Sequence, residues 1–130
     1  MRYSPYMFSR TVKPAARPAR IPDEGLSPSS RDDLETHLSI IVPVFNEEEN
    51  IEVLHEKISD CMSSAEYDWE LLVVDDGSTD ATYERLAGIR ARDSHLRVVR
   101  LRRNFGKSAA YSAGFDHARG GIVVTMDGDL

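Results

Sequence analysis

Cysteine is nearly absent from this chain of 130 residues, in which Cys61 is the single example. One cysteine cannot form an internal disulfide, which argues against a disulfide-stapled secreted domain and favours a reducing compartment. Long apolar runs are also absent. No segment reaches the roughly 20 residues of a membrane-spanning helix, and no apolar stretch near the start is typical of a secretory signal. We therefore expect a cytoplasmic location or the cytoplasmic face of a membrane.

An overall excess of positive charge is missing too, because the formal net charge is −6. The first twenty residues hold five basic residues and no acidic one, so the acidic charge is concentrated in the rest of the chain. An acidic body argues against nucleic acid as a partner. A basic segment on such a body is typical of a solvated arm or of one that touches a membrane.

Two common nucleotide-binding motifs are not found. No G-x-G-x-x-G follows the first long apolar segment, which argues against a dinucleotide-binding fold of the usual kind. Gly106-Lys107-Ser108 resembles the end of a P-loop, but that motif requires a glycine where Leu101 stands. A nucleotide site in this chain would have to be built in another way.

The character of the sequence changes near residue 38. Residues 1–37 contain five of the six prolines, many Ser and Arg, and no sustained apolar period, so they are predicted to be disordered. Beyond them, apolar patterns predict strands at 38–44, 69–74, 96–101 and 122–126. Helices are predicted at 48–62, 80–92 and 107–119, the second with Ser78, Thr79 and Asp80 available for its N-cap. Apolar strands that alternate with helices predict an α/β fold, a parallel sheet covered on both faces.

Polar residues follow all four predicted strands. In open α/β sheets, ligands bind outside the carboxyl ends of the strands, so these clusters are expected to form one site. Asp127 and Asp129 are two carboxylates one residue apart, which suits Mg²⁺ or Mn²⁺, since both ions prefer oxygen ligands and often accompany a diphosphate. The four clusters are Pro43-Val44-Phe45-Asn46-Glu47, Asp75-Asp76-Gly77-Ser78, Arg102-Arg103-Asn104-Phe105-Gly106-Lys107 and Asp127-Gly128-Asp129.

Each cluster taken alone also has a simpler interpretation. The Asp75–Ser78 segment could be a turn followed by a helix cap, and Asp127-Gly128 is a common turn pair. The cations Arg100, Arg102, Arg103 and Lys107 could be a solvated edge instead of a phosphate-attracting surface.

Taken together, the four segments resemble family 2 glycosyltransferases in order and spacing over residues 38–130. Within that family they look most like the polyprenyl-phosphate sugar transferases, the group that includes dolichol-phosphate mannosyltransferase. The stretch Arg103-Asn104-Phe105-Gly106-Lys107 favours this group. The resemblance implies a Rossmann-like GT-A nucleotide-sugar domain. It also implies transfer of a sugar from a UDP- or GDP-sugar to an acceptor, here a lipid-linked polyprenyl phosphate.

The resemblance also implies a role for each matching residue. Pro43, Phe45 and Glu47 would line the nucleotide pocket, with Phe45 standing where relatives often have Tyr. The base would be held by Val74 and Asp76, with Asp75 supporting their loop. The triplet would contact the diphosphate and its Mg²⁺ or Mn²⁺ through Asp127 and Asp129, with Gly128 standing where Ala is common.

In this family the acceptor-binding half and any catalytic base lie beyond the metal-binding triplet. Residues 38–130 are therefore expected to be the N-terminal part of a GT-A domain, a fragment that is inactive alone and has an open sheet edge. The alternative from another class is a non-catalytic nucleotide-binding or interaction module.

Overall fold

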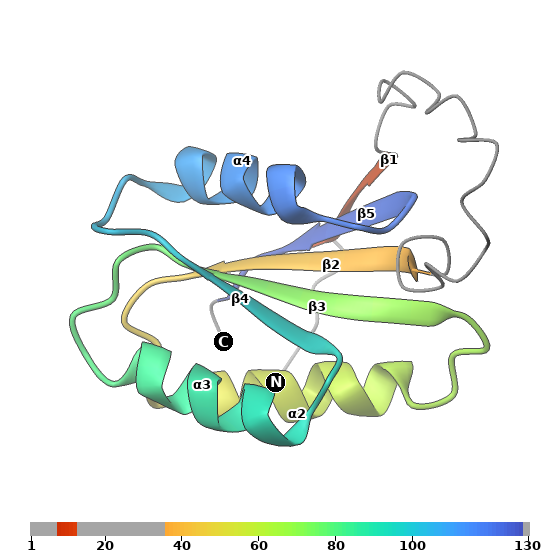
Figure 1. Cartoon of the computed structure of the whole chain (residues 1–130), viewed down its shortest axis with the longest axis horizontal. Helices are drawn as coiled ribbons and strands as arrows, with labels where there is room; N and C mark the ends of the chain where they lie inside the picture. Colours follow the sequence, from red (N-terminus) through yellow and green to blue (C-terminus); the bar gives the residue numbers. More distant parts are fainter. Residues whose placement is uncertain (1–7, 13–35, 129–130) are drawn as a thin grey trace, which may run out of the picture.

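Four parallel strands and one antiparallel strand form a single sheet with the order β1-β5-β2-β3-β4 (Figure 1). The computed structural model describes residues 8–12 and 36–128. The strands are β1 Phe8–Val12, β2 Thr36–Val44, β3 Asp68–Asp75, β4 Leu96–Arg100 and β5 Ile122–Met126. The helices are α2 Ile51–Met62, α3 Thr82–Arg92 and α4 Lys107–His117.

The central strands are buried on both faces because successive side chains point to opposite sides of a strand. On β2, Ile40, Val42 and Val44 belong to one apolar cluster, which includes residues of α2 and α3. Ile41 lies between them and belongs to a second cluster, with Ala110 of α4. This double burial explains why β2 and β3 are almost continuously apolar, and it confirms the predicted α/β class.

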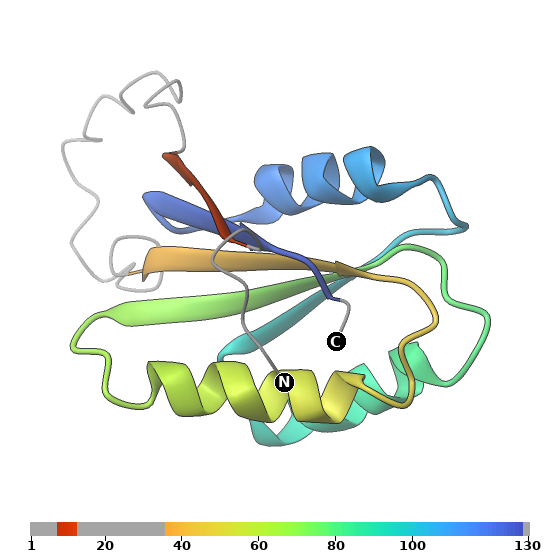
Figure 2. The ribbon, with the colours of Figure 1, turned by 180° about the vertical axis from the view of Figure 1, so that it is seen from behind.

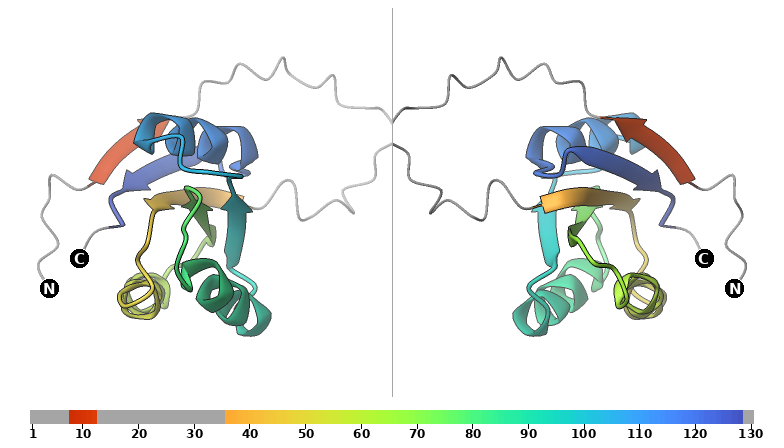
Figure 3. Two further views of the ribbon diagram at one scale, coloured as in Figure 1. Left: turned by 90° about the vertical axis from the view of Figure 1, so that its left-hand side faces the viewer. Right: turned by 90° about the vertical axis from the view of Figure 1, so that its right-hand side faces the viewer.

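Helices α2 and α3 cover one face of the sheet and α4 covers the other, as the end-on views of Figure 3 show. A Cβ added to Gly114 of α4 would lie 2.5 Å from Cγ2 of Ile41, so this glycine lets α4 approach the sheet closely. The small residues of this helix therefore allow it to pack closely on the sheet.

The chain reverses its direction of travel across the sheet after β4. It runs from β2 to β3 to β4 in neighbouring positions, and α4 then carries it back to β5 on the other side of β2. The strand order therefore switches between β2 and β5, and the crevice at such a switch point is where α/β sheets bind ligands.

The strands and helices predicted beyond residue 37 are all present, with shifted ends. Helix α2 begins at Ile51 and not at 48. Residues 48–50 form a turn instead, in which the Glu47 carbonyl accepts hydrogen bonds from the N–H groups of Asn50 and Ile51. Helix α3 begins at Thr82, and its N-cap residue is Ala81 and not one of the three predicted residues, although Asp80 Oδ1 accepts the Thr82 N–H at 2.9 Å.

The prediction of disorder for residues 1–37 was wrong for the five residues of β1 and for the first two of β2. Strand β1 pairs antiparallel with β5, with Phe8 opposite Met126 and Val12 opposite Ile122. Figures 1 and 2 show β1 in red beside β5 in blue. This pairing satisfies the outer backbone groups of β5, so the edge expected to be open is covered. Residues 1–7 and 13–35 lie outside the described residues.

Within 8–12 and 36–128, no helix is long and apolar enough to cross a bilayer.

Candidate nucleotide-binding site

The loops after β2 and β3 are joined by hydrogen bonds at the carboxyl ends of their strands. The Asn46 N–H donates to Ser78 Oγ at 2.9 Å, and the Thr79 N–H donates to Asn46 Oδ1 at 2.8 Å. The Glu47 N–H donates to Thr82 Oγ1 at 2.9 Å. Asn46 has a φ of 51°, a left-handed conformation that asparagine tolerates better than most residues. These contacts hold the two loops as one unit.

Asp75 and Asp76 are both buried, and the carboxylate of each holds a different loop in place. Asp75 Oδ1 accepts the Ser78 N–H at 2.9 Å, while its Oδ2 is buried without a hydrogen-bond partner among the residues described. Asp76 is 4% exposed, and its two oxygens accept the N–H groups of Phe105 and Gly106 at 2.8 and 3.1 Å. The Asp76 carboxylate therefore anchors the loop between β4 and α4.

The anchored loop packs directly on Gly77. A Cβ added to Gly77 would lie 2.2 Å from the backbone carbon of Arg103, and the φ of Gly77 is +73°. The loop presents cations and an aromatic ring to solvent. The Arg103 guanidinium lies 4.6 Å from the centroid of Phe105, which is 45% exposed. The guanidinium of Arg100 lies 4.1 Å from the Tyr83 ring. Such stacking favours defined positions for both arginines.

Asp127 follows β5 and faces α4. Lys107 Nζ lies 3.1 Å from Asp127 Oδ1, and the Tyr111 hydroxyl donates to the same oxygen at 3.2 Å. The Asp127 side chain is 38% exposed. This carboxylate is therefore oriented by two donors and is still open to solvent.

The structure places the remaining predicted residues that it describes at the same end of the sheet. Pro43 and Val74 are paired in register on β2 and β3, and both are buried, so Val74 itself offers no exposed surface to a ligand. Phe45 is 41% exposed and Glu47 is half-buried. A Cβ on Gly128 would lie 2.7 Å from the Pro43 carbonyl oxygen, so Gly128 packs against the end of β2. Asp129 lies outside the described residues.

The donor set at this end suits a hard divalent cation, because the exposed Asp127 carboxylate offers oxygen ligands. The described residues include no group of three or more His, Cys, Asp or Glu side chains arranged to hold a metal. A cation bound here would therefore need oxygens from a ligand and from water in addition to Asp127.

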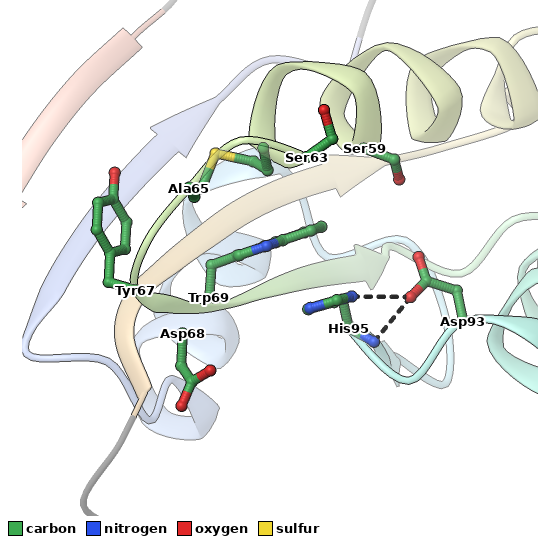
Figure 4. Close-up of a pocket in the computed structure, with 9 residues that line it drawn as sticks. Ser59, Ser63, Ala65, Tyr67, Asp68, Trp69, Asp93 and His95 are labelled. Atoms are coloured by element: carbon green, nitrogen blue, oxygen red, sulfur yellow. Dashed lines mark hydrogen bonds and ion pairs between the residues drawn. The ribbon is translucent and has the colours of Figure 1, made fainter.

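A pocket of about 400 Å³ lies at the opposite end of the sheet (Figure 4). The Trp69 and His95 rings stack there with centroids 4.0 Å apart, and Asp93 Oδ1 lies 3.1 Å from His95 Nδ1. None of the predicted site residues lines this pocket. The lining residues are Ser59, Met62, Ser63, Ala65, Tyr67, Asp68, Trp69, Asp93 and His95.

The chain is similar in structure to solved GT-A glycosyltransferases. The mannosyltransferase PcManGT from Pyrobaculum calidifontis, in complex with GDP-Man and Mn²⁺, has a TM-score of 0.60 and 32% identity, over 73% of this chain and 28% of that one. S. aureus TarS 1-349 in complex with UDP has a TM-score of 0.62 and 28% identity, over 72% and 28%. The α/β fold seen here is therefore the GT-A fold of nucleotide-sugar enzymes.

Residues 39–130 match the family described as Glycosyl transferase family 2, and the chain belongs to that family. It is also 50% identical over 94 residues to a dodecaprenyl-phosphate galacturonate synthase from Rhizobium johnstonii. That match covers 72% of this chain and 28% of the relative. The chain therefore spans less than a third of the length of this relative. The predicted membership of family 2, with similarity to polyprenyl-phosphate sugar transferases, is confirmed.

Several residues that build the candidate site were not predicted from the sequence. Tyr111 was not among the predicted residues, although its position four residues after Lys107 places both on one face of α4. The bonds from Asn46 to Ser78 and Thr79 were not predicted either. Each of these residues is a common turn former, so its type carried no signal of a contact between loops.

Proposed function

We propose that this chain forms the nucleotide-binding part of a glycosyltransferase that moves a sugar from a UDP- or GDP-sugar to a polyprenyl phosphate. The main support is the hydrogen-bond network at the carboxyl ends of the strands, in which Asn46 joins two loops and Asp76 holds a third. The name of the Rhizobium relative supports a lipid phosphate as the acceptor. An acceptor of this kind would place the enzyme at the cytoplasmic face of a membrane.

The proposed roles follow the positions of the residues. Pro43, Phe45 and Glu47 shape the nucleotide pocket, and Phe45 offers an exposed ring for stacking. Val74 supports the base side of the site from the buried end of β3. Asp76 holds that side of the site together with its loop. Asp75 supports that loop through Ser78.

Asp127 and Asp129 are proposed to hold Mg²⁺ or Mn²⁺, with Gly128 keeping the triplet close to β2. A bound cation would stabilise the negative charge that develops on the leaving nucleoside diphosphate. An acceptor phosphate is already anionic and needs less help from a general base than a neutral hydroxyl group would.

These 130 residues alone are proposed to bind a nucleoside diphosphate weakly, with the help of the cation, and not to transfer sugar. The support is that the 94 matched residues cover 28% of the Rhizobium relative, so most of that enzyme has no counterpart among them. The alternative, a non-catalytic nucleotide-binding module, predicts the same binding but no transfer by any longer form of the protein.

Calorimetry with UDP and GDP, with and without Mn²⁺, tests the proposal. We expect Asp129→Ala to remove the dependence on metal, because one of its two carboxylate ligands is lost. Asp76→Ala should weaken nucleoside binding even without metal, because the loop at residues 105–106 loses its anchor. Tight metal-free binding that Asp129→Ala leaves unchanged would contradict the metal site. Measurable transfer to a polyprenyl phosphate would contradict the inactivity of this chain.

A further inference from the structure

The backbone of Lys107 is held in place, whereas its ammonium group is exposed to solvent. The residue before it, Gly106, donates its N–H to the buried Asp76 carboxylate, so the start of α4 is held in place. The Lys107 side chain is nevertheless 56% exposed. Its ammonium group can therefore change partner by rotating about side-chain bonds, without any movement of the helix.

The ammonium group lies against the carboxylate that the proposed function assigns to the metal. Lys107 Nζ and the Tyr111 hydroxyl both contact Asp127 Oδ1, at 3.1 and 3.2 Å. The guanidinium groups of Arg100 and Arg103 lie over aromatic rings instead. Among the residues that the structure describes, Lys107 is therefore the cation that pairs with Asp127.

A positive charge at Asp127 has opposite effects on two ligands. It opposes a free divalent cation, because the carboxylate oxygen is partly neutralised and like charges repel. It favours a nucleoside diphosphate, because an ammonium group can donate charge-assisted hydrogen bonds to phosphate oxygens. A diphosphate brought to Asp127 by a shared cation would lie within reach of the Lys107 side chain.

We propose that Lys107 is a charge-switching residue of the site, an inference that rests on the proposed function. In the ligand-free protein it pairs with Asp127 and lowers the affinity for the metal alone. When a nucleoside diphosphate is bound, it donates to the phosphates instead, while Tyr111 keeps the Asp127 carboxylate oriented. Lys107 thereby makes the site prefer the cation together with its nucleotide over the cation alone.

The test uses the full chain and the variant Lys107→Met. Free Mn²⁺ is measured by electron paramagnetic resonance, first without nucleotide and then with UDP or GDP. We expect Mn²⁺ alone to bind about threefold more tightly, the size of an exposed ion pair. We expect the Mn²⁺–nucleoside diphosphate complex to bind about tenfold more weakly, the size of a hydrogen bond to a charged group.

Two further variants separate this mechanism from simpler ones. Lys107→Arg keeps the charge but carries it on a larger planar group, so it should change each affinity less than Lys107→Met does. Arg90→Met removes one exposed cation from the last turn of α3 and should leave both unchanged, which controls for net charge. Circular dichroism confirms that each variant is folded.

The inference is overturned if Lys107→Met shifts both affinities in the same direction or shifts neither. In that case the proposed function stands, provided that the original chain binds the Mn²⁺–nucleotide complex. If the original chain itself fails to bind that complex, the proposed function of these residues and the inference fall together.

Discussion

The two ends of the same sheet use polar residues in opposite ways. At the amino end, Glu70 is buried and its carboxylate accepts hydrogen bonds from Ser39, Arg97 and the Arg119 N–H, at 2.7, 2.7 and 2.8 Å. At the carboxyl end, Asp76 is equally buried, but its partners belong to a loop that presents exposed Arg103, Phe105 and Lys107.

A buried acidic side chain can therefore belong either to a structural network or to the support of a binding surface. The Glu70 network joins three strands to the turn between α4 and β5, which is also why α4 ends at His117, earlier than the predicted residue 119. It is a closed structural network. The Asp76 network holds a surface in position for something else, and it lies at the switch point where ligands are expected.

The largest effect is expected at the carboxyl end, from Gly77→Ala. A side chain here would require an unfavourable positive φ and would overlap the Arg103 backbone. We expect a loss of about 4 kcal/mol in the free energy of unfolding, the sum of typical left-handed strain and overpacking. Urea denaturation measures it.

The matched control for that variant is Gly88→Ala on α3, where a Cβ would meet no atom within 4 Å. It should stabilise the protein by about 0.5–1 kcal/mol, because alanine favours the helix. Equal effects of the two substitutions would contradict the close packing of the loop on Gly77.

At the amino end, Glu70→Ala should cost about 3 kcal/mol of stability, because it leaves Arg97 and two further donors without their buried acceptor. The same chemical denaturation experiment measures the loss. Nucleotide affinity, extrapolated to the folded fraction, should not change. A selective loss of nucleotide binding would show that the two ends are not separate in function.

The Glu70 contribution should depend on pH. Burial raises the pKa of Glu70, but hydrogen bonds from the Arg119 N–H, Arg97 and Ser39 outweigh it and hold the pKa below its ordinary value of 4.5. A lowered folded-state pKa means that the stabilisation is complete above the ordinary value and is lost as the pH falls through the folded value. The difference in unfolding free energy between the original chain and Glu70→Gln should therefore shrink below pH 4.5. A difference that grows on acidification would contradict this assignment.

The smallest effect is expected in the pocket at the amino end. His95→Ala removes the ring that stacks on Trp69 and one contact to Asp93, and it should cost about 1 kcal/mol. Thermal unfolding followed by tryptophan fluorescence measures both the loss and the change around Trp69. If the variant instead abolished nucleotide binding, the pocket would have to be counted as part of the site.

Much of this architecture is predictable from local sequence patterns. Strands β2 and β3 are continuous apolar runs, and the apolar residues of α2 recur at helical spacing. Both patterns can be recognised within a short stretch of sequence. Strand β1 escaped prediction because its partner β5 lies more than a hundred residues away, and its five residues have no long apolar pattern of their own.

The position of the candidate site could be predicted from the sequence, but its hydrogen bonds could not. An acid after a buried strand predicts a position at the carboxyl edge of the sheet, and Asp76 and Asp127 both lie there. The sequence could not show that loop N–H groups occupy the Asp76 oxygens, or that Lys107 and Tyr111 share Asp127 Oδ1. Such contacts depend on the three-dimensional packing of loops, which residue types alone do not determine.

The most direct test of the central claim is a map of ligand contacts by amide chemical shifts in nuclear magnetic resonance. The chain, labelled with ¹⁵N, is titrated with UDP or GDP in the presence of Mg²⁺. We expect the shifts to concentrate at residues 44–48, 75–79, 103–108 and 127–128, and residues 59–69 and 93–95 to stay unchanged. Shifts centred on Tyr67, Trp69 and His95 would contradict it, because the ligand would then occupy the opposite end of the sheet.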